Sequence, residues 1–214
     1  MFLFKILLFS MAFISSYFIG NFCAAIIISN TLNKKDIRTL GSTNAGTTNM
    51  LRTFGIRYGL ITFVIDFGKG YLCTLLWQFL FIRFTDDITT MLSMHISGLL
   101  LILGHNYPLI FNFKGGKGFA TAIGVYLVIN PIYTLYSILI ALFILFIVDR
   151  MSVCALTFFT TQVIFSCCFY LKGNLMCFFS LIYLMLAIIS HWPNIIRLVN
   201  QTEPRLYLFK KNRK

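Results

Sequence analysis

The segment from Gly104 to Thr121 carries the residues whose types and spacing point most clearly to chemistry. It reads Gly-His-Asn-Tyr-Pro, a short apolar link, and then Phe-Lys-Gly-Gly-Lys-Gly-Phe-Ala-Thr. Glycines let the backbone approach a ligand closely and leave amide N–H groups able to point at it. Gly118 is placed to open a helix, whose N-terminus adds partial positive charge, and Lys114 and Lys117 add full charges. The segment therefore predicts a phosphate site, against the alternative of a basic turn that only fixes topology.

Another polar segment, Gly41–Arg52, combines small residues, hydroxyls, amides and an arginine. In chain order it is the first polar segment, and Gly104–Thr121 is the second. The structural alternative is that Ser42 or Thr48 caps a helix that carries Arg52. A cap does not account for two asparagines and three threonines in the same twelve residues. The Arg52 guanidinium also matches the planar oxygens of a phosphate or carboxylate in a way that a lysine does not. The pattern favours a second set of phosphate contacts.

A third polar segment runs over 191–198 and is followed by Glu203 and Arg205. Three of its residues recur at every third position, so one helical turn aligns them on one side: His191, Asn194 and Arg197. A histidine at a membrane boundary is more often a structural residue, but the amide and guanidinium beside it favour a binding site.

Two ionisable residues, Asp66 and Lys69, lie three positions apart inside an apolar run. Such groups within a bilayer are costly and face the protein interior or a cavity. They either only neutralise each other or help to orient the active loops, and the sequence leaves both readings open. His105 is as well suited to holding its loop as to catalysis, whereas His95 stands alone and gives no functional signal.

Composition indicates what must position these segments. Of 214 residues, 58% are hydrophobic and only 11% are charged, whereas a soluble domain has about a quarter charged residues. The sequence therefore predicts an all-α integral membrane protein, with residues 1–214 forming a single domain. The net charge of +12 does not indicate nucleic-acid binding, because the basic residues lie mainly in short loops between apolar runs.

We expect about seven membrane segments, one of them short: 6–29, 59–82, 88–112, 119–130, 131–148, 152–171 and 175–190. The first is longer than the roughly 7–15 apolar residues of a signal peptide, which favours a retained helix over a cleaved leader. The segment 119–130 spans only about 18 Å. Its N-terminus and the adjoining Lys-Gly-Gly-Lys-Gly turn should then be re-entrant and lined by protein.

The distribution of basic residues predicts the orientation. The segments 30–57, 104–118, 149–151 and 191–214 hold five, two, one and six Lys or Arg residues, fourteen of the eighteen in the chain. Because cytoplasmic loops are enriched in Lys and Arg, these segments are assigned to the cytoplasm, with the N-terminus outside and the C-terminus inside. The three polar segments then form one cationic pocket suited to substrates with phosphate heads and acyl tails.

Several other chemistries are not indicated. No Gly-x-x-x-x-Gly-Lys-Ser/Thr motif occurs, since Gly118 follows Lys117, which argues against nucleotide hydrolysis. No His-x-x-x-x-Asp pair or aspartate cluster occurs, so acyltransferases that use that pair and metal-dependent transfer are not expected. The cysteines have no metal-like spacing and are expected to be packing thiols: Cys23, Cys73, Cys154, Cys167, Cys168 and Cys177.

The three polar segments resemble those of the bacterial acyl-phosphate:glycerol-3-phosphate acyltransferases. That family's patterns are approximately Gly-Ser-Gly-Asn-x-Gly-Ala-Thr-Asn-x-x-Arg, Gly-His-x-x-Pro-x-x-x-x-Phe-Lys-Gly-Gly-Lys-Gly-x-Ala-Thr, and His-x-x-Asn-Ile-x-Arg-Leu followed by Gly-x-Glu-x-Lys. Asp36-Ile37-Arg38 and Asp66-x-x-Lys69-Gly70 also look like family features, and the match runs nearly the length of the chain. The chain departs from these patterns at four positions: Thr43 and Gln201 replace glycines, Thr47 an alanine and Arg205 a lysine.

The resemblance implies transfer of an acyl group from acyl phosphate to the 1-hydroxyl of sn-glycerol 3-phosphate, giving lysophosphatidate and phosphate. It implies no cofactor or metal, and a bacterial inner (plasma) membrane location with the site facing the cytoplasm. The implied partners are the two substrates, the lipid bilayer and other enzymes of phospholipid synthesis. Two other classes are kept as alternatives: a transporter for phosphorylated solutes and a non-catalytic scaffold that binds anionic lipids.

Within the acyltransferase reading, the residues fall into three groups. The expected catalytic residues are Ser42, Arg52, Lys117, His191 and Asn194. The expected substrate and phosphate contacts are Asn44, Gly46, Thr48, Asn49, His105, Lys114, Gly115, Gly116, Gly118 and Arg197. Asp66, Lys69 and Glu203 are expected to support them. Whether His191 is a general base or only positions the glycerol phosphate is left open by the sequence.

Overall fold

A computed structural model describes residues 2–33, 35–169 and 173–206. Throughout these residues the regular secondary structure is helical, with ten α-helices and two short 3₁₀-helices and no strand. The chain divides into two compact units, Met1–Pro131 and Ile132–Lys214, and each is described by itself. The single domain expected from the sequence stays a prediction.

Apolar helices long enough to cross a membrane confirm an all-α polytopic membrane protein. Five candidate spans occur in the described residues, and a bent pair at the C-terminal end makes up to six. The short apolar segment expected at 119–130 is helix α6 (Phe119–Ile129). The total of seven segments and their orientation stay predictions. Some predicted features fall outside the described residues: positions 170–171 at the end of one predicted span, and the basic residues Lys34, Lys172 and those of 207–214.

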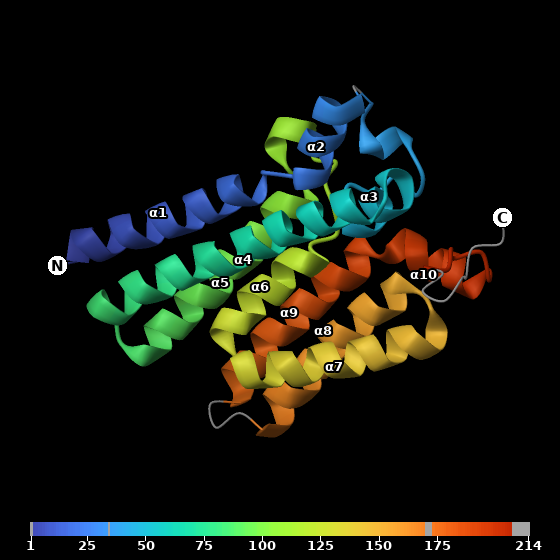
Figure 1. Cartoon of the computed structure of the whole chain (residues 1–214). Helices are drawn as coiled ribbons and strands as arrows, with labels where there is room; N and C mark the ends of the chain where they lie inside the picture. Colours follow the sequence, from blue (N-terminus) through green and yellow to red (C-terminus); the bar gives the residue numbers. More distant parts are fainter. Residues whose placement is uncertain (1, 34, 170–172, 207–214) are drawn as a thin grey trace. The chain divides into compact units, whose positions relative to one another are not determined.

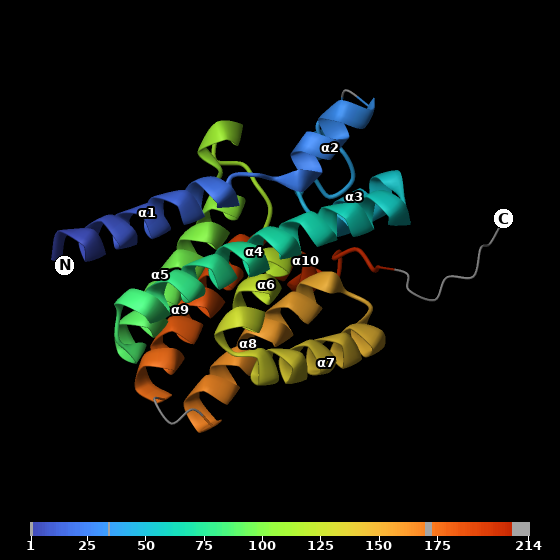
Figure 2. The ribbon, with the colours of Figure 1, turned by 60° about the vertical axis from the view of Figure 1, so that its left-hand side comes forward.

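In the first unit the chain forms α1 (Phe2–Gly20), α2 (Ala24–Asn33), α3 (Thr47–Phe54), α4 (Ile56–Phe84), α5 (Asp87–Asn106) and α6. The 3₁₀-helices η1 (Ile37–Thr39) and η2 (Leu109–Phe111) lie in its loops. Helix α1 packs on α5, and α4 packs on both α5 and α6. Figures 1 and 2 show the short extended stretch between α1 and α2 that changes the direction of the chain.

Two predicted helices end earlier than their apolar runs. The run at 6–29 is broken at residues 21–23, where the Asn21 side chain donates to the Tyr17 carbonyl at 2.6 Å and competes with the helix ladder. The run at 88–112 ends at Asn106, because Tyr107 precedes Pro108 and such a residue avoids the helical region. The two helix breaks lie next to each other, since the Tyr17 hydroxyl donates to the Tyr107 carbonyl at 2.8 Å.

Close backbone contact between α1 and α5 depends on two glycines. A Cβ atom on Gly20 would collide with the Leu101 carbonyl, and one on Gly104 would collide with the Tyr17 carbonyl. The absence of side chains lets the two helix ends touch through their main chains. This contact brings the break after α1 to the end of α5, directly beside the second polar segment.

The second unit contains α7 (Pro131–Val148), α8 (Met151–Phe169), α9 (Gly173–Ser190) and α10 (Trp192–Val199). Helices α8 and α9 pack together, and Ser166 and Ser180 join them with a hydrogen bond of 2.8 Å between their hydroxyls. The Gln162 amide donates to the Thr134 hydroxyl at 3.1 Å and ties α8 to α7. Helix α10 follows α9 after a bend of 64° and ends the regular structure of the described chain.

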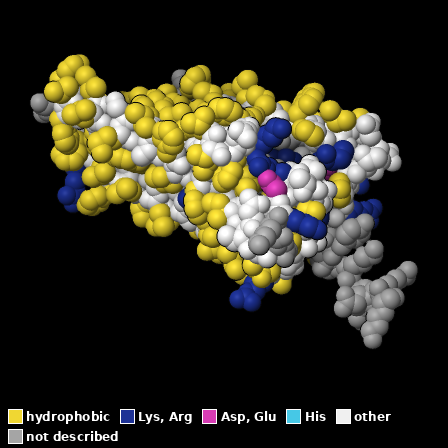
Figure 3. Space-filling view, turned by 90° about the horizontal axis from the view of Figure 1, so that it is seen from above, with side chains coloured by type: hydrophobic (Ala, Val, Ile, Leu, Met, Phe, Trp, Pro, Cys, Tyr) yellow, Lys and Arg dark blue, Asp and Glu magenta, His cyan; other side chains and the backbone are white. Residues whose placement is uncertain are grey.

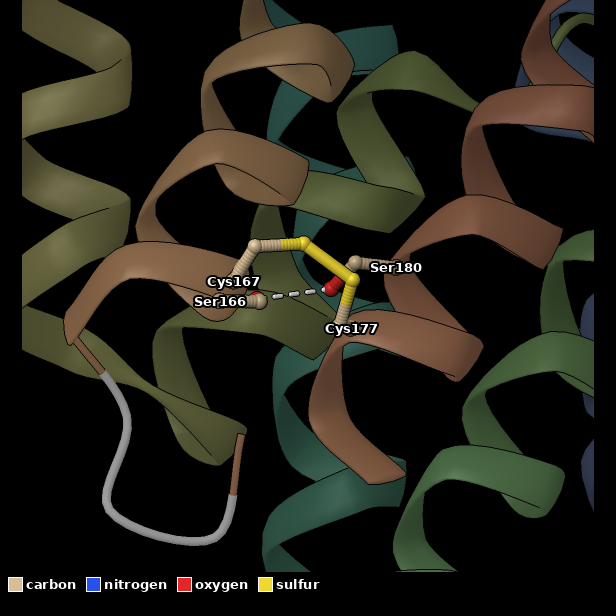
Figure 4. The surroundings of a disulfide bond; sticks show 4 residues. All are labelled: Ser166, Cys167, Cys177 and Ser180. Carbon is tan, nitrogen blue, oxygen red and sulfur yellow. Dashed lines mark hydrogen bonds between the residues drawn. A yellow bond between two sulfur atoms is a disulfide. The ribbon is translucent and has the colours of Figure 1, made fainter. Parts of the chain in front are cut away.

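A disulfide joins Cys167 of α8 to Cys177 of α9, so the expectation that all six cysteines are packing thiols is wrong (Figure 4). The two helices turn back on each other over a short connection, which brings these Cα atoms, ten residues apart in sequence, to 5.0 Å. Cys23, Cys73 and Cys154 are buried thiols as expected, and Cys168 is an exposed thiol.

Candidate functional site

The first polar segment forms a loop that is organised around Asn49. This side chain is fully buried, and its amide donates to the carbonyls of Ile37, Leu40 and Asn44 at 3.2, 2.9 and 3.1 Å. Its oxygen accepts the Ser42 N–H at 2.9 Å. The structure therefore gives Asn49 a positioning role in place of the phosphate contact that the sequence suggested.

Neither Ser42 nor Thr48 caps helix α3, so that alternative is wrong. Gly46 occupies the N-cap position without a side-chain hydrogen bond, and the helix begins at Thr47. The loop leaves the Ser42, Asn44 and Thr48 side chains partly exposed. Arg52 lies exposed one helical turn after Thr48. These groups therefore remain candidates for substrate contact.

The glycines of the second polar segment use two of their amides within the fold. Gly115 N–H donates to the Asn106 carbonyl and Gly116 N–H to the His105 carbonyl, each at 3.1 Å. These two amides were expected to hold phosphate, but their bonds to the end of α5 give the loop its shape instead. Gly118 has φ of 76° and precedes α6, as predicted. The part of this segment that remains a candidate for binding an anion is Lys117, Gly118 and the first turn of α6, where helix N–H groups lack intrahelical acceptors.

Arg38 connects the first and second polar segments. Its guanidinium donates to the carbonyls of Phe111 and Lys114 at 2.9 and 3.0 Å, and pairs with the Asp36 carboxylate at 2.6 Å. Hydrogen bonds from Arg38 lower the pKa of Asp36. In the sequence, Asp36 and Arg38 stood out only as family features. An aspartate and an arginine two residues apart, in a loop beside a glycine motif, were a further signal for this ion pair.

Gly116 marks the point where the two segments touch. A Cβ atom built there would collide with the His105 ring and lie 2.6 Å from the Ala45 carbonyl. The second polar segment is therefore packed between the end of α5 and the first polar segment. Lys114 is exposed and Lys117 is half-buried beside this contact. On the face in Figure 3, hydrophobic side chains cover most of the surface, and Lys and Arg side chains gather at one end.

Asp66, Lys69 and His105 form a buried cluster behind this loop. The Lys69 ammonium lies 2.9 Å from the Asp66 carboxylate and 2.8 Å from Nδ1 of His105. An ammonium can only donate, so Nδ1 of His105 accepts, and the neutral ring carries its proton on Nε2. A ring held in this way is unsuited to act as a base toward a ligand near Gly116. The cluster therefore favours the loop-holding role for His105.

In the second unit, the Glu203 carboxylate organises the third polar segment. One oxygen accepts from the Asn194 amide at 2.7 Å and from the Ser152 hydroxyl at 2.8 Å, and the other accepts from Arg197 Nε at 2.8 Å. The Arg150 guanidinium donates to the Glu203 carbonyl at 3.1 Å. Asn194 and Arg197 thus share one side of α10, as their spacing predicted.

Burial alone would raise the pKa of Glu203. The hydrogen bonds from Asn194, Arg197 and Ser152 outweigh that effect, and the pKa of this carboxyl is lowered. The carboxylate form therefore stabilises the C-terminal end of α10 at neutral pH. Ser152 and Arg150 were not predicted from the sequence, because nothing in their spacing links them to Glu203 some fifty residues later.

His191 lies buried at the bend between α9 and α10. Its Nδ1 is 2.9 Å from the Ala187 carbonyl, which can only accept, so Nδ1 carries the proton. In a neutral ring this tautomer makes Nε2 the acceptor nitrogen, which is the one that a general base would use. This tautomer is the reverse of the one that Lys69 selects in His105.

The predicted site residues divide between the two units. The first unit contains Ser42, Asn44, Gly46, Thr48, Asn49, Arg52, Asp66, Lys69, His105, Lys114, Gly115, Gly116, Lys117 and Gly118. The second unit contains His191, Asn194, Arg197 and Glu203. Of the residues that the structure describes, no three or more His, Cys, Asp or Glu side chains are grouped so that they could hold a metal ion.

Two departures from the expected motifs have left-handed backbone angles. Thr43 and Gln201 stand where the family pattern has glycine, and their φ angles are 60° and 58°. Left-handed φ angles are costly for residues with a Cβ and most costly for β-branched ones. Both positions therefore have a conformation that glycine adopts more readily.

Comparison with known proteins identifies the family to which these segments belong. The family model described as glycerol-3-phosphate acyltransferase matches residues 10–201. The chain belongs to the glycerol-3-phosphate acyltransferase family. A family member from Finegoldia magna is 39% identical over 89% of this chain and 92% of its own length, and one from Alkaliphilus metalliredigens is 37% identical over 90% and 93%.

Two solved structures of the family are similar over most of this chain. One is the glycerol 3-phosphate form of PlsY (YgiH), an integral membrane glycerol 3-phosphate acyltransferase, with a TM-score of 0.81 and 32% identity over 92% of this chain and 94% of that one. The lysophosphatidic acid form of the same enzyme has a TM-score of 0.78 and 30% identity with the same coverage. These matches support the family assignment at the level of both sequence and fold.

Proposed function

We propose that this protein transfers an acyl group from acyl phosphate to the 1-hydroxyl of sn-glycerol 3-phosphate. The hydroxyl oxygen bonds to the acyl carbon, the bond between that carbon and the phosphate oxygen breaks, and lysophosphatidate and inorganic phosphate leave. The observation that carries the proposal is the Lys-Gly-Gly-Lys-Gly loop, which Arg38 ties to the first polar segment in a membrane-embedded member of this family.

The first unit supplies the cationic part of the site. Arg52, Lys114 and Lys117 neutralise the two phosphates, and the first turn of α6 adds backbone N–H donors. Ser42, Asn44 and Thr48 contribute hydroxyl and amide groups from a loop whose shape Asn49 fixes. Donors of this kind stabilise the oxyanion that develops at the acyl carbon.

The proposed contacts to glycerol 3-phosphate include Asn194 and Arg197 of the third polar segment. Glu203 holds Asn194 and Arg197 on one side of α10. The hydroxyl proton passes either to the leaving phosphate, which is basic, or to Nε2 of His191. The pH dependence of kcat separates these routes. A histidine base gives an inflection near its own pKa, and His191→Gln removes that inflection. With phosphate as the base, His191→Gln removes no inflection.

The site faces the cytoplasm in the bacterial inner membrane under this proposal. The excess of Lys and Arg in the segments 30–57, 104–118, 149–151 and 191–214 supports that orientation. The cytoplasmic side is also where soluble glycerol 3-phosphate and the other enzymes of phospholipid synthesis meet the membrane. No cofactor is required, because acyl phosphate is already activated and its phosphate is the leaving group.

Purified protein in detergent, given palmitoyl phosphate and labelled glycerol 3-phosphate, tests the proposal. We expect labelled lysophosphatidate and an equal amount of released phosphate, with no requirement for nucleotide or added metal. A transporter or a lipid-binding scaffold makes neither product. Binding of glycerol 3-phosphate without product formation from any acyl phosphate between C12 and C18 would overturn the proposal.

A further inference from the structure

The Lys69 side chain, on α4, links the ends of α1 and α5 behind the glycine loop of the second polar segment. Its ammonium donates to the carbonyls of Gly20 and Phe22 at 3.2 and 2.7 Å, which belong to the break after α1. It also reaches Nδ1 of His105 at the end of α5 at 2.8 Å, and pairs with Asp66 on its own helix at 2.9 Å. A single cation thus links α4 to both helix ends that contact each other through Gly20 and Gly104.

The surroundings explain why a lysine is tolerated in a membrane span. The side chains of Asp66 and Lys69 are only 2% and 6% exposed, so the pair is removed from water and from lipid. The carbonyls that end α1 form the negative pole of that helix, which favours a cation there. A lysine that only neutralised Asp66 would need no bonds to α1 and α5. These additional contacts indicate a second role.

From His105 the connection continues into the glycine loop. The His105 carbonyl accepts the Gly116 N–H at 3.1 Å and the Cys23 thiol at 3.5 Å. The imidazole ring packs against Gly116, where no Cβ atom would fit. The next carbonyl, that of Asn106, accepts the Gly115 N–H at 3.1 Å. Any shift of His105 is therefore passed directly to the backbone of the loop that carries Lys114 and Lys117.

We propose that Lys69, oriented by Asp66, is a positioning residue that sets the conformation of the phosphate loop through His105. It touches neither substrate. Its cation pins the end of α5 to the break after α1, so that Gly115 and Gly116 are held in the binding-competent arrangement before substrate arrives. The proposal rests on the proposed function, because the loop is taken to bind a phosphate group of the substrates.

Loss of a positioning contact has a recognisable kinetic signature. If only a fraction of molecules holds the competent loop, the apparent affinity falls by that fraction, and saturating substrate restores the competent state. Lys69→Met keeps the length of the side chain and removes the charge. We expect it to raise KM for at least one of the two phosphate substrates roughly tenfold while kcat changes less than about threefold. Lys69→Arg retains a cation and should recover most of the loss.

Hydrogen–deuterium exchange tests the structural half without using activity. In Lys69→Met and Asp66→Asn, peptides covering 104–121 should exchange faster than in the wild type, because the amides of Gly115 and Gly116 lose a fixed acceptor. Thr74→Val is the matched control, since the hydroxyl of this buried residue of α4 donates to the Gly70 carbonyl of its own helix at 2.8 Å. The control should leave exchange over 104–121 unchanged.

The two measurements separate the possible failures. Unchanged exchange over 104–121 in folded Lys69→Met protein would overturn the positioning role even if the wild type is an active acyltransferase. If Lys69→Met exchanges faster over 104–121 but the wild type makes no lysophosphatidate, the positioning role of Lys69 stands and only the proposed function is overturned. A loss confined to kcat and to melting temperature, equal in Lys69→Met and Thr74→Val, would mean general destabilisation and would also overturn the proposal.

Discussion

The two units build their polar segments by different means. In the first unit the loop of Gly115 and Gly116 is shaped by backbone carbonyls at the end of α5, and its charge comes from lysines beside it. In the second unit the Glu203 carboxylate gathers the amide and guanidinium of α10 directly. The first arrangement fixes a loop through backbone hydrogen bonds, whereas the second fixes side chains through a buried carboxylate.

The two buried histidines show a second contrast. Lys69 makes Nδ1 of His105 an acceptor, and the Ala187 carbonyl makes Nδ1 of His191 a donor. Two histidines that look equivalent in the sequence thus use Nδ1 in opposite ways.

The largest effect is expected from removing a cation in the first unit. Lys117→Ala and Arg52→Ala should each lower kcat/KM by about 10²–10³, because each removes a preorganised charge from the phosphates. Arg83→Ala is the matched control, since this arginine lies over the Phe79 ring at the end of α4, outside the polar segments. Turnover of lysophosphatidate with purified variants is the measurement. A Lys117→Ala variant that keeps more than a tenth of wild-type kcat/KM would contradict the role of the loop.

A smaller effect is expected from weakening the hydrogen bonds of Glu203 in the second unit. Glu203→Gln keeps the shape of the side chain but presents an N–H group where an acceptor for Arg197 or Asn194 is needed. We expect kcat/KM to fall roughly tenfold or more, as for loss of a hydrogen bond to a charged group. KM for glycerol 3-phosphate should account for most of the fall. An unchanged KM for that substrate would separate α10 from acceptor binding.

The same carboxylate predicts a pH dependence of stability. The pKa of Glu203 is lowered in the folded protein, so its contribution is complete above the unfolded value of about 4.5 and is lost as pH falls through the folded pKa. The melting temperature of the wild type should therefore decline below pH 4.5 more steeply than that of Glu203→Gln. Differential scanning fluorimetry between pH 3 and 7 measures both curves. Parallel curves would show that Glu203 is not a carboxylate held by these bonds.

The smallest effect concerns the two left-handed residues, one in each unit. Thr43→Gly and Gln201→Gly should each raise the free energy of unfolding by up to about 1 kcal/mol, because glycine adopts φ near 60° without a steric cost. Thr43→Gly should give the larger gain, since its side chain is β-branched. Chemical denaturation measures the change. Equal or lower stability in Thr43→Gly would show that the threonine side chain compensates for its backbone.

The sequence was informative where a feature is local. Apolar length predicts the membrane helices, and the glycine before Phe119 predicts where α6 begins. The three-residue spacing in the third segment predicts that Asn194 and Arg197 share one side. These features depend on helix geometry alone, which is why they can be inferred without a structure.

The remainder depends on partners distant in the chain. The amides of Gly115 and Gly116 are occupied by the Asn106 and His105 carbonyls at the end of α5, and no local pattern indicates that pairing. The disulfide between Cys167 and Cys177 depends on the way two helices turn back on each other. The sequence identified Glu203 as supporting but not its bond to Ser152, because side-chain pairs of that separation are set by packing.

The central claim is that the Lys-Gly-Gly-Lys-Gly loop of the first unit binds a substrate phosphate. Hydrogen–deuterium exchange of the wild type with and without a saturating amount of glycerol 3-phosphate or of acyl phosphate, each alone, tests it most directly, by following peptides over 104–121. The account predicts protection of this segment by at least one of the two substrates, and a loss of that protection in Lys117→Ala. Unchanged exchange over 104–121 at saturation with either substrate would contradict the claim.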